Sequence, residues 1–283
     1  MTWAVFTAAI ASALLHALWN MLGKTRSAPP EMFVGIVLAT ASICTGFLPI
    51  VGVPNPQSWP WIIGSSLCNA LYLQVVMRAY AAGQFNVVYA IVRAVIPPTL
   101  FVFGWLLLAE VKQLHALVGV ALIVISLSLF ATLKIESGKS QRRSLLLAVV
   151  AGFLLALSLL CDVKGIRVGG LGMFNLFRYS VASSLTTASI LIVSSLLLRQ
   201  NPFAALKGNT GQCYLGAALL LLSYLCGMWA YVHGPIGLVA PLRESGILLG
   251  GLLSVAILRE RVTELQWAAM GLATIGVVLI QVG

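Results

Sequence analysis

The chain has 283 residues, of which 60% are hydrophobic and only 8% are charged, and its formal net charge is +10. Because soluble domains carry about 25% charged residues, this composition excludes a water-soluble fold and makes the lipid bilayer the expected solvent. The basic residues lie mostly between apolar runs, where they contact lipid headgroups, and no basic stripe with interleaved aromatic residues predicts nucleic-acid binding.

The apolar runs predict ten membrane-spanning helices, because about twenty apolar residues cross a bilayer. The first run, MTWAVFTAAIASALLHALWN, follows no basic segment and shows no clean cleavage site, so we interpret it as a retained span. The longest polar stretch is a basic linker at residues 134–144, which separates a first unit at 1–133 from a second at 145–283. The predicted spans are residues 2–22, 31–51, 61–81, 85–108, 113–133, 145–163, 172–198, 212–232, 236–258 and 264–282.

The two units resemble each other weakly. The first contains RAYAAGQFNVVYAIVRAVIPPTLFVFGWLLLAE and the second contains MWAYVHGPIGLVAPLRESGILLGGLLSVAILRE. The Ala-Tyr pair at 79–80 matches the pair at 230–231, and Arg93 matches Arg243 after a gap of one residue. Five spans are an odd number, so the second unit enters the membrane in the opposite orientation. We therefore predict an all-α membrane protein of two inverted five-helix repeats.

This pattern resembles the drug/metabolite transporter superfamily, specifically its ten-span EamA-like members. The resemblance rests on an AY-x-x-G segment, an apolar span with an internal proline, a closing glutamate and a glycine-bearing span, all present twice, and on HALWN at 16–20. It covers the whole chain and implies a multi-pass transporter, but no particular solute, because the superfamily carries many. The second unit departs at the counterpart of HALWN, where it reads LSLLCDVKG.

The distribution of basic residues predicts the orientation in the membrane. Most basic residues outside the spans fall on one side, and the other side holds only Lys112, Lys164 and Arg167. The positive-inside rule places the richer side in the cytoplasm, so both termini face outward. The family resemblance implies both termini inside instead, and we favour the charge count. The expected location is a bacterial inner membrane.

Two arginines, Arg93 and Arg243, lie deep in apolar spans. A charge inside a lipid-spanning helix is costly, so it usually faces a protein interior or a watery cavity. Pro97 and Pro98 follow Arg93, Pro241 precedes Arg243, and each proline breaks the helix by depriving a carbonyl of its partner. A guanidinium matches a carboxylate, phosphate or phosphonate. We predict that both arginines bind an anionic group of the substrate; the alternative is a structural charge paired with an acid or a helix-end carbonyl.

Glu244 is the candidate for proton coupling. Apart from acids near span ends, it is the only acid that we expect deep within a span, and low dielectric favours its protonated form. The alternative is a buried, ionised partner of Arg93 or Arg178. Asp162 is interpreted as a boundary residue at the end of the sixth span.

Further candidates surround these charges. His16, Trp19 and Asn20 share one helix face at i, i+3 and i+4, either lining the substrate site or forming an interhelical hydrogen bond with Trp19 at the membrane interface. Arg178 either faces the cavity or extends to the headgroups. The predicted substrate-binding residues are Arg93, Arg243, Tyr89, His16, Trp19, Asn20, Tyr72, Tyr224 and Arg178.

Enzymatic motifs are absent: there is no HExxH, no GxSxG and no Walker loop, and the three histidines and five cysteines show no metal-binding spacing. We expect no enzyme, no metal and no cofactor. Small residues recur at every fourth position from 246 to 254, which favours close helix packing within a monomer or a homodimer.

The predicted function is secondary transport of a small polar, anionic metabolite by alternating access. Two alternatives stay open. One is a proton-coupled exporter of drugs or amphipathic cations that uses Glu244 and aromatic walls. The other is a component of a lipid-carrier flippase, with a lateral opening between helices, or a purely structural membrane partner without a water-filled cavity.

Overall fold

The computed structural model describes residues 1–24, 29–82, 85–108, 114–132, 139–197, 199, 201–244 and 264–282, and every long element in these ranges is an α-helix. This confirms the predicted all-α class. In chain order the elements are α1 (Trp3–Lys24), α2 (Pro29–Val51), the 3-10 turn η1 (Pro56–Ser58), α3 (Trp59–Ala82), α4 (Phe85–Leu108), α5 (Leu114–Thr132), α6 (Lys139–Gly169), α7 (Met173–Leu197), α8 (Ala204–His233), α9 (Ile236–Glu244) and α11 (Glu264–Val282).

Several helices have the length and composition of membrane spans. Within the described residues, five stretches are long and apolar enough to cross a bilayer: Met32–Val51, Pro56–Ala82, Arg142–Gly169, Met173–Leu197 and Thr210–His233. Shorter apolar helical stretches are Trp3–Trp19, Ile91–Leu107 and Leu117–Ser126. The protein is therefore an integral membrane protein. The count of ten spans stays a prediction, because the ninth predicted span, 236–258, continues into residues 245–263, which lie outside the described residues.

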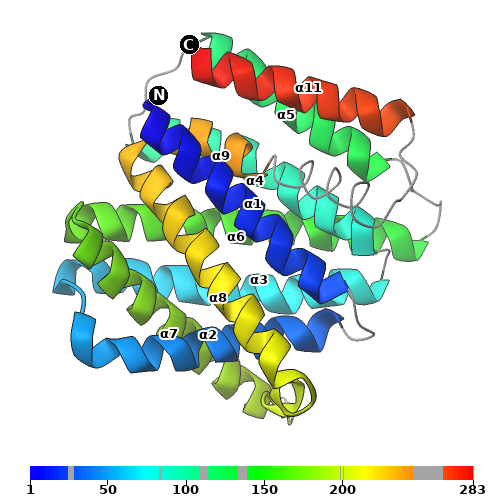
Figure 1. The fold of residues 1–283 in the computed structure, drawn as a ribbon. Helices are drawn as coiled ribbons and strands as arrows, with labels where there is room; N and C mark the ends of the chain where they lie inside the picture. Colours follow the sequence, from blue (N-terminus) through cyan, green and yellow to red (C-terminus); the bar gives the residue numbers. More distant parts are fainter. Residues whose placement is uncertain are drawn as a thin grey trace.

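The helices pack in pairs that join the two halves of the chain. α1 packs on α8, α3 on α6, α4 on α9, α2 on α7 and α5 on α11. In Figure 1, α5 and α11 lie together at one end of the bundle, and α2 and α7 lie toward the other. Each pair takes one helix from α1 to α5 and one from α6 to α11, so a site at the centre of the bundle receives side chains from both halves.

Close backbone contacts fix the helices that carry the deep charges. A Cβ on Gly152 of α6 would lie 2.7 Å from the carbonyl oxygen of Val92 in α4, so only glycine lets the two helices approach this closely. Between α1 and α8, Ser12 donates to the carbonyl of Ser223 at 2.7 Å, and Ser223 donates to the carbonyl of Ser12 at 2.8 Å. The first contact holds α6 against the part of α4 that carries Arg93. The second holds α1 against α8 at Ser12, which contacts Arg243.

The prolines do not end their helices, contrary to the helix breaks that the sequence predicts. α4 runs on through Pro97 and Pro98, and α9 contains Pro241. Proline removes one donor and crowds the preceding turn, but packing on both sides can hold the helix together. Ile96 and Leu100, which flank the two prolines of α4, are both fully buried.

Candidate functional site

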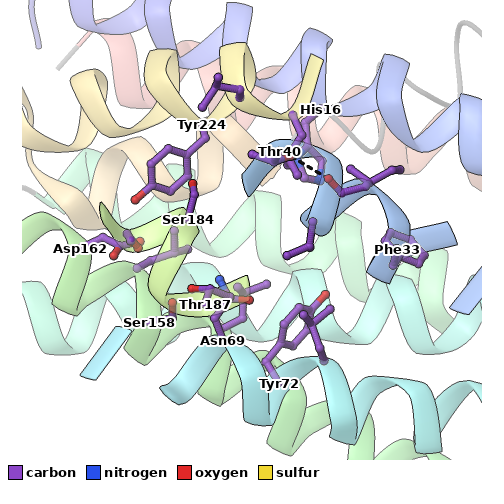
Figure 2. A pocket seen from close by; sticks show the side chains of 18 of the residues that line it. His16, Phe33, Thr40, Asn69, Tyr72, Ser158, Asp162, Ser184, Thr187 and Tyr224 are labelled. Carbon is purple, nitrogen blue, oxygen red and sulfur yellow. Dashed lines mark hydrogen bonds between the residues drawn. The ribbon is translucent and has the colours of Figure 1, made fainter. Parts of the chain in front are cut away.

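A pocket of about 180 Å³ lies between the two halves of the chain (Figure 2). Its walls come from α1, α2, α3, α4, α6, α7, α8 and α9. Its charged lining residues are Arg93, Asp162 and Arg243, and its aromatic ones are Trp19, Phe33, Tyr72, Tyr80 and Tyr224. A concave site with apolar walls and few polar groups is typical of small-molecule binding.

Arg93 of α4 forms a buried ion pair with Glu244 of α9. Its Nη1 donates to both carboxylate oxygens of Glu244, at 3.0 and 3.3 Å. Arg93 is 6% exposed and Glu244 is 2% exposed. The pair joins the two halves and leaves Arg93 with little net charge to offer to a ligand. Glu244 thus has the buried arginine partner that the sequence offered as the alternative to proton coupling.

His16 of α1 is held between two donors. Trp19 donates from Nε1 to Nδ1 of His16 at 3.1 Å, and Nη2 of Arg93 lies within hydrogen-bond distance of Nε2. A neutral imidazole offers one acceptor nitrogen and an imidazolium offers none. One of these two hydrogen bonds can therefore form at a time, and a neutral ring fits this position better than a charged one.

Arg243 of α9 lines the pocket and forms no ion pair with a described acid. It is 8% exposed, its Nε donates to Ser12 at 3.1 Å, and its guanidinium carbon lies 5.8 Å from the centroid of the Tyr231 ring. A Cβ on Gly227 would lie 3.0 Å from this Nε, so glycine leaves the room that the side chain occupies. Asp162 is the pocket-lining acid that acts on Arg243 electrostatically, and it forms no ion pair with this arginine.

Asp162 is a second deep acid, and the sequence prediction that it marks the boundary of a span is wrong. α6 continues to Gly169, about two turns beyond it, because the helix extends past the polar residues at which the apolar run stops. Asp162 is 2% exposed, lines the pocket and accepts a hydrogen bond from Tyr179 at 3.1 Å. A signal was available, since LSLLCDVKG stands at the counterpart of the pocket-lining HALWN.

The structure brings many of the other predicted residues to the pocket. His16, Trp19, Tyr72 and Tyr224 line it together with the two arginines. Asn20 and Tyr89 belong to α1 and α4, but their side chains lie outside the described part of the structure.

Arg178 is not among the lining residues. Its Nε donates to the carbonyl of Val51, the last residue of α2, at 2.6 Å, and its guanidinium lies over Phe174. The final carbonyls of a helix lack intrahelical donors, so this arginine satisfies the end of α2.

Small hydroxyl groups form a part of the wall that the sequence did not reveal. Thr40, Ser158, Ser183, Ser184 and Thr187 line the pocket. Three of them come from the run SSLTT in α7, which is the only signal for them in the sequence. They add hydrogen-bonding capacity without charge.

The comparisons with known proteins agree with this fold. Residues 142–282 match the model of the EamA-like transporter family, a family of transporters and not of enzymes. The comparison with curated proteins gives no match. A solved structure described as "Crystal structure of protein" is similar to 98% of this chain over 95% of its own length, with a TM-score of 0.73 and 15% sequence identity. This likeness shows the fold alone.

Proposed function

We propose, from the premise that the second half of this chain belongs to the EamA-like transporter family, that the protein carries a small polar metabolite with an anionic group by alternating access. The observation that carries the proposal is Arg243, a buried cation on the pocket wall without an ion-pair partner among the described residues. Taking a charge out of water costs several kcal/mol unless it is paired. A carboxylate, phosphate or phosphonate on the substrate would supply that partner.

The roles of the two arginines differ in this proposal. Arg93 is neutralised by Glu244 and holds His16, so it shapes the pocket and joins α4 to α9. Arg243 keeps its charge for the ligand. Both were predicted as anion-binding residues from sequence, and the geometry favours the second as the direct contact.

Packing between the halves supports alternating access. The fourth helix of one half packs on its counterpart in the other, α4 on α9, and the last helices of the two halves pack together, α5 on α11. The first helix of each half packs on the third helix of the other half, α1 on α8 and α6 on α3. This arrangement is expected for two inverted repeats at 1–133 and 145–283 that rock against each other around a fixed site. A bacterial inner membrane is the location we propose.

The alternatives make different demands on the pocket. A proton-coupled exporter that uses Glu244 must break the Arg93–Glu244 pair at each proton uptake. A lipid-carrier flippase needs a lateral opening for a long chain, whereas a pocket of about 180 Å³ suits a small metabolite. A structural partner has no need of an arginine on a pocket wall.

The proposal is tested by a thermal-shift screen of the purified protein against carboxylates, phosphates and phosphonates, run on wild type, Arg243→Gln and Arg178→Gln. A ligand stabilises only the state that binds it. The expected result is an anion-dependent rise of the midpoint in wild type and Arg178→Gln, and none in Arg243→Gln. Arg178→Gln is the matched control, because it also removes a charge from a membrane helix but leaves the pocket wall intact. An equal rise in Arg243→Gln contradicts the proposal.

A further inference from the structure

Asp162 occupies a distinct part of the pocket wall. In Figure 2, Asp162, Ser184 and Tyr224 lie on one side of the pocket, and Phe33 lies on the other. The carboxylate is 2% exposed and is oriented by the hydroxyl of Tyr179. A buried acid held at a pocket wall by a fixed hydrogen bond has the position of a binding group.

The groups that hydrogen-bond with Asp162 are neutral. The side chains that face its carboxylate are the hydroxyl groups of Ser65, Tyr179 and Tyr224, and no described lysine, arginine or histidine forms an ion pair with it. The contrast with Glu244 is direct, because that acid has Arg93 at 3.0 Å. Hydroxyl donors stabilise a carboxylate but carry no charge, and Arg243, the cation that acts on Asp162 across the pocket, forms no ion pair with it.

The hydroxyl of the tyrosine beside this acid is only partly satisfied. Tyr224 points its oxygen toward Asp162 (Figure 2), and this buried oxygen interacts with Asp162 and Ser183 without reaching the geometry of a full hydrogen bond. A phenolic oxygen accepts as well as donates. A cationic donor placed between Asp162 and Tyr224 would satisfy both groups at once.

The charges of the pocket divide into one pair and two single charges. Arg93 is neutralised by Glu244, whereas Arg243 and Asp162 both line the pocket and neither forms an ion pair within the described part of the chain. The pocket therefore presents one positive and one negative group, on helices α9 and α6, in a volume of about 180 Å³. A small molecule with the same two charges would neutralise both.

We propose that Asp162 binds a protonated amine, so that the transported solute is a zwitterion: a small amino carboxylate or aminophosphonate with its anionic group at Arg243 and its ammonium group at Asp162 and Tyr224. An ammonium has three donors and no acceptor, which suits a carboxylate and a phenolic oxygen. This inference rests on the proposed function, because it assumes that Arg243 holds the anionic end.

The experiment measures affinity by isothermal titration calorimetry with matched probes. One series is leucine, isocaproate and isoamylamine, and a second is aminoethylphosphonate, ethylphosphonate and ethylamine. Each series gives the zwitterion, the acid without the amine and the amine without the acid. The proteins are wild type, Asp162→Asn, Asp162→Glu, Arg243→Gln and, as the matched acid control, Glu264→Gln, which changes an exposed acid at the start of α11.

The expected result is that wild type binds at least one zwitterion about tenfold or more tightly than the matching acid, since a buried charge-assisted hydrogen bond is worth at least this factor. Asp162→Asn removes this preference and leaves the affinity for the acid within about twofold. Glu264→Gln behaves as wild type. Asp162→Glu, which keeps the charge and moves it by one methylene, lowers the preference for the zwitterion and covers the case in which Asp162→Asn does not fold.

Two results separate the failure of this inference from that of the proposed function. If wild type binds an acid and its zwitterion equally, and Arg243→Gln abolishes both, Asp162 is not an amine site and the anion proposal stands. If no anionic probe binds, or if Arg243→Gln binds as wild type does, both proposals fail. A wild-type preference for the zwitterion that survives in Asp162→Asn also overturns the inference, because the amine then binds elsewhere.

Discussion

The buried pair between Arg93 and Glu244 gives the sharpest prediction on stability. Glu244→Gln leaves a guanidinium in the bundle without a counter-charge, and Arg93→Gln leaves an uncompensated carboxylate. Both side chains are nearly inaccessible to solvent, and Nη1 of Arg93 contacts both carboxylate oxygens. Removing one partner of such a pair costs about 3–5 kcal/mol, because the remaining charge stays buried.

The double variant Arg93→Gln/Glu244→Gln removes both charges, so it should be destabilised by less than the sum of the two single changes. For residues in direct contact we expect a coupling energy of about 1–3 kcal/mol. The assay is denaturant unfolding of the four proteins in one detergent, followed by far-ultraviolet circular dichroism. Additive effects within about 0.5 kcal/mol would refute the reasoning, because independent sites behave in this way.

Three other predictions concern packing and orientation. Gly152→Ala should destabilise the protein by about 1–3 kcal/mol in the same unfolding assay, since its Cβ meets a carbonyl at 2.7 Å; Gly46→Ala in α2, with nothing within 4 Å, is the control and should be neutral or slightly stabilising. Ser12→Ala should lower the free energy of unfolding by about 0.6–2 kcal/mol and also weaken anion binding, because the Ser12 hydroxyl donates to the carbonyl of Ser223 and accepts from Arg243. Unchanged unfolding and binding would contradict this. Alkaline phosphatase fused to the C-terminus should be active, because the charge count places both termini outside, and an inactive phosphatase with a fluorescent cytoplasmic fusion would reverse the orientation.

Much of the fold could be predicted from the sequence, because the bilayer restricts what the chain can form. The bilayer core holds no water that could hydrogen-bond with backbone groups, so an apolar run of about twenty residues becomes a helix. The limits of the apolar run then indicate approximately where that helix begins and ends. The ends of α6 and α8 were less predictable. Both helices include polar residues that the bilayer does not select for, so α6 exceeds the predicted span 145–163 at both ends and α8 begins before the predicted span 212–232.

Site residues could be predicted where a charged residue interrupts a long apolar run. Arg93, Arg243 and Glu244 are conspicuous on that ground, and all three are buried between the halves. Their pairing was not predictable, because the residues 93 and 244 come together only through the packing of α4 on α9. Asp162 was misread for the opposite reason: a nearby lysine and arginine made it resemble the end of a span.

Uptake by reconstituted protein tests the central claim most directly. Proteoliposomes are loaded with the unlabelled anion that gives the largest thermal shift, and exchange for external labelled anion is followed for wild type, Arg243→Gln and Arg178→Gln. The account predicts rapid exchange by wild type and Arg178→Gln, and exchange by Arg243→Gln at the level of protein-free liposomes. Exchange by Arg243→Gln at the wild-type rate, or none by wild type, would contradict it.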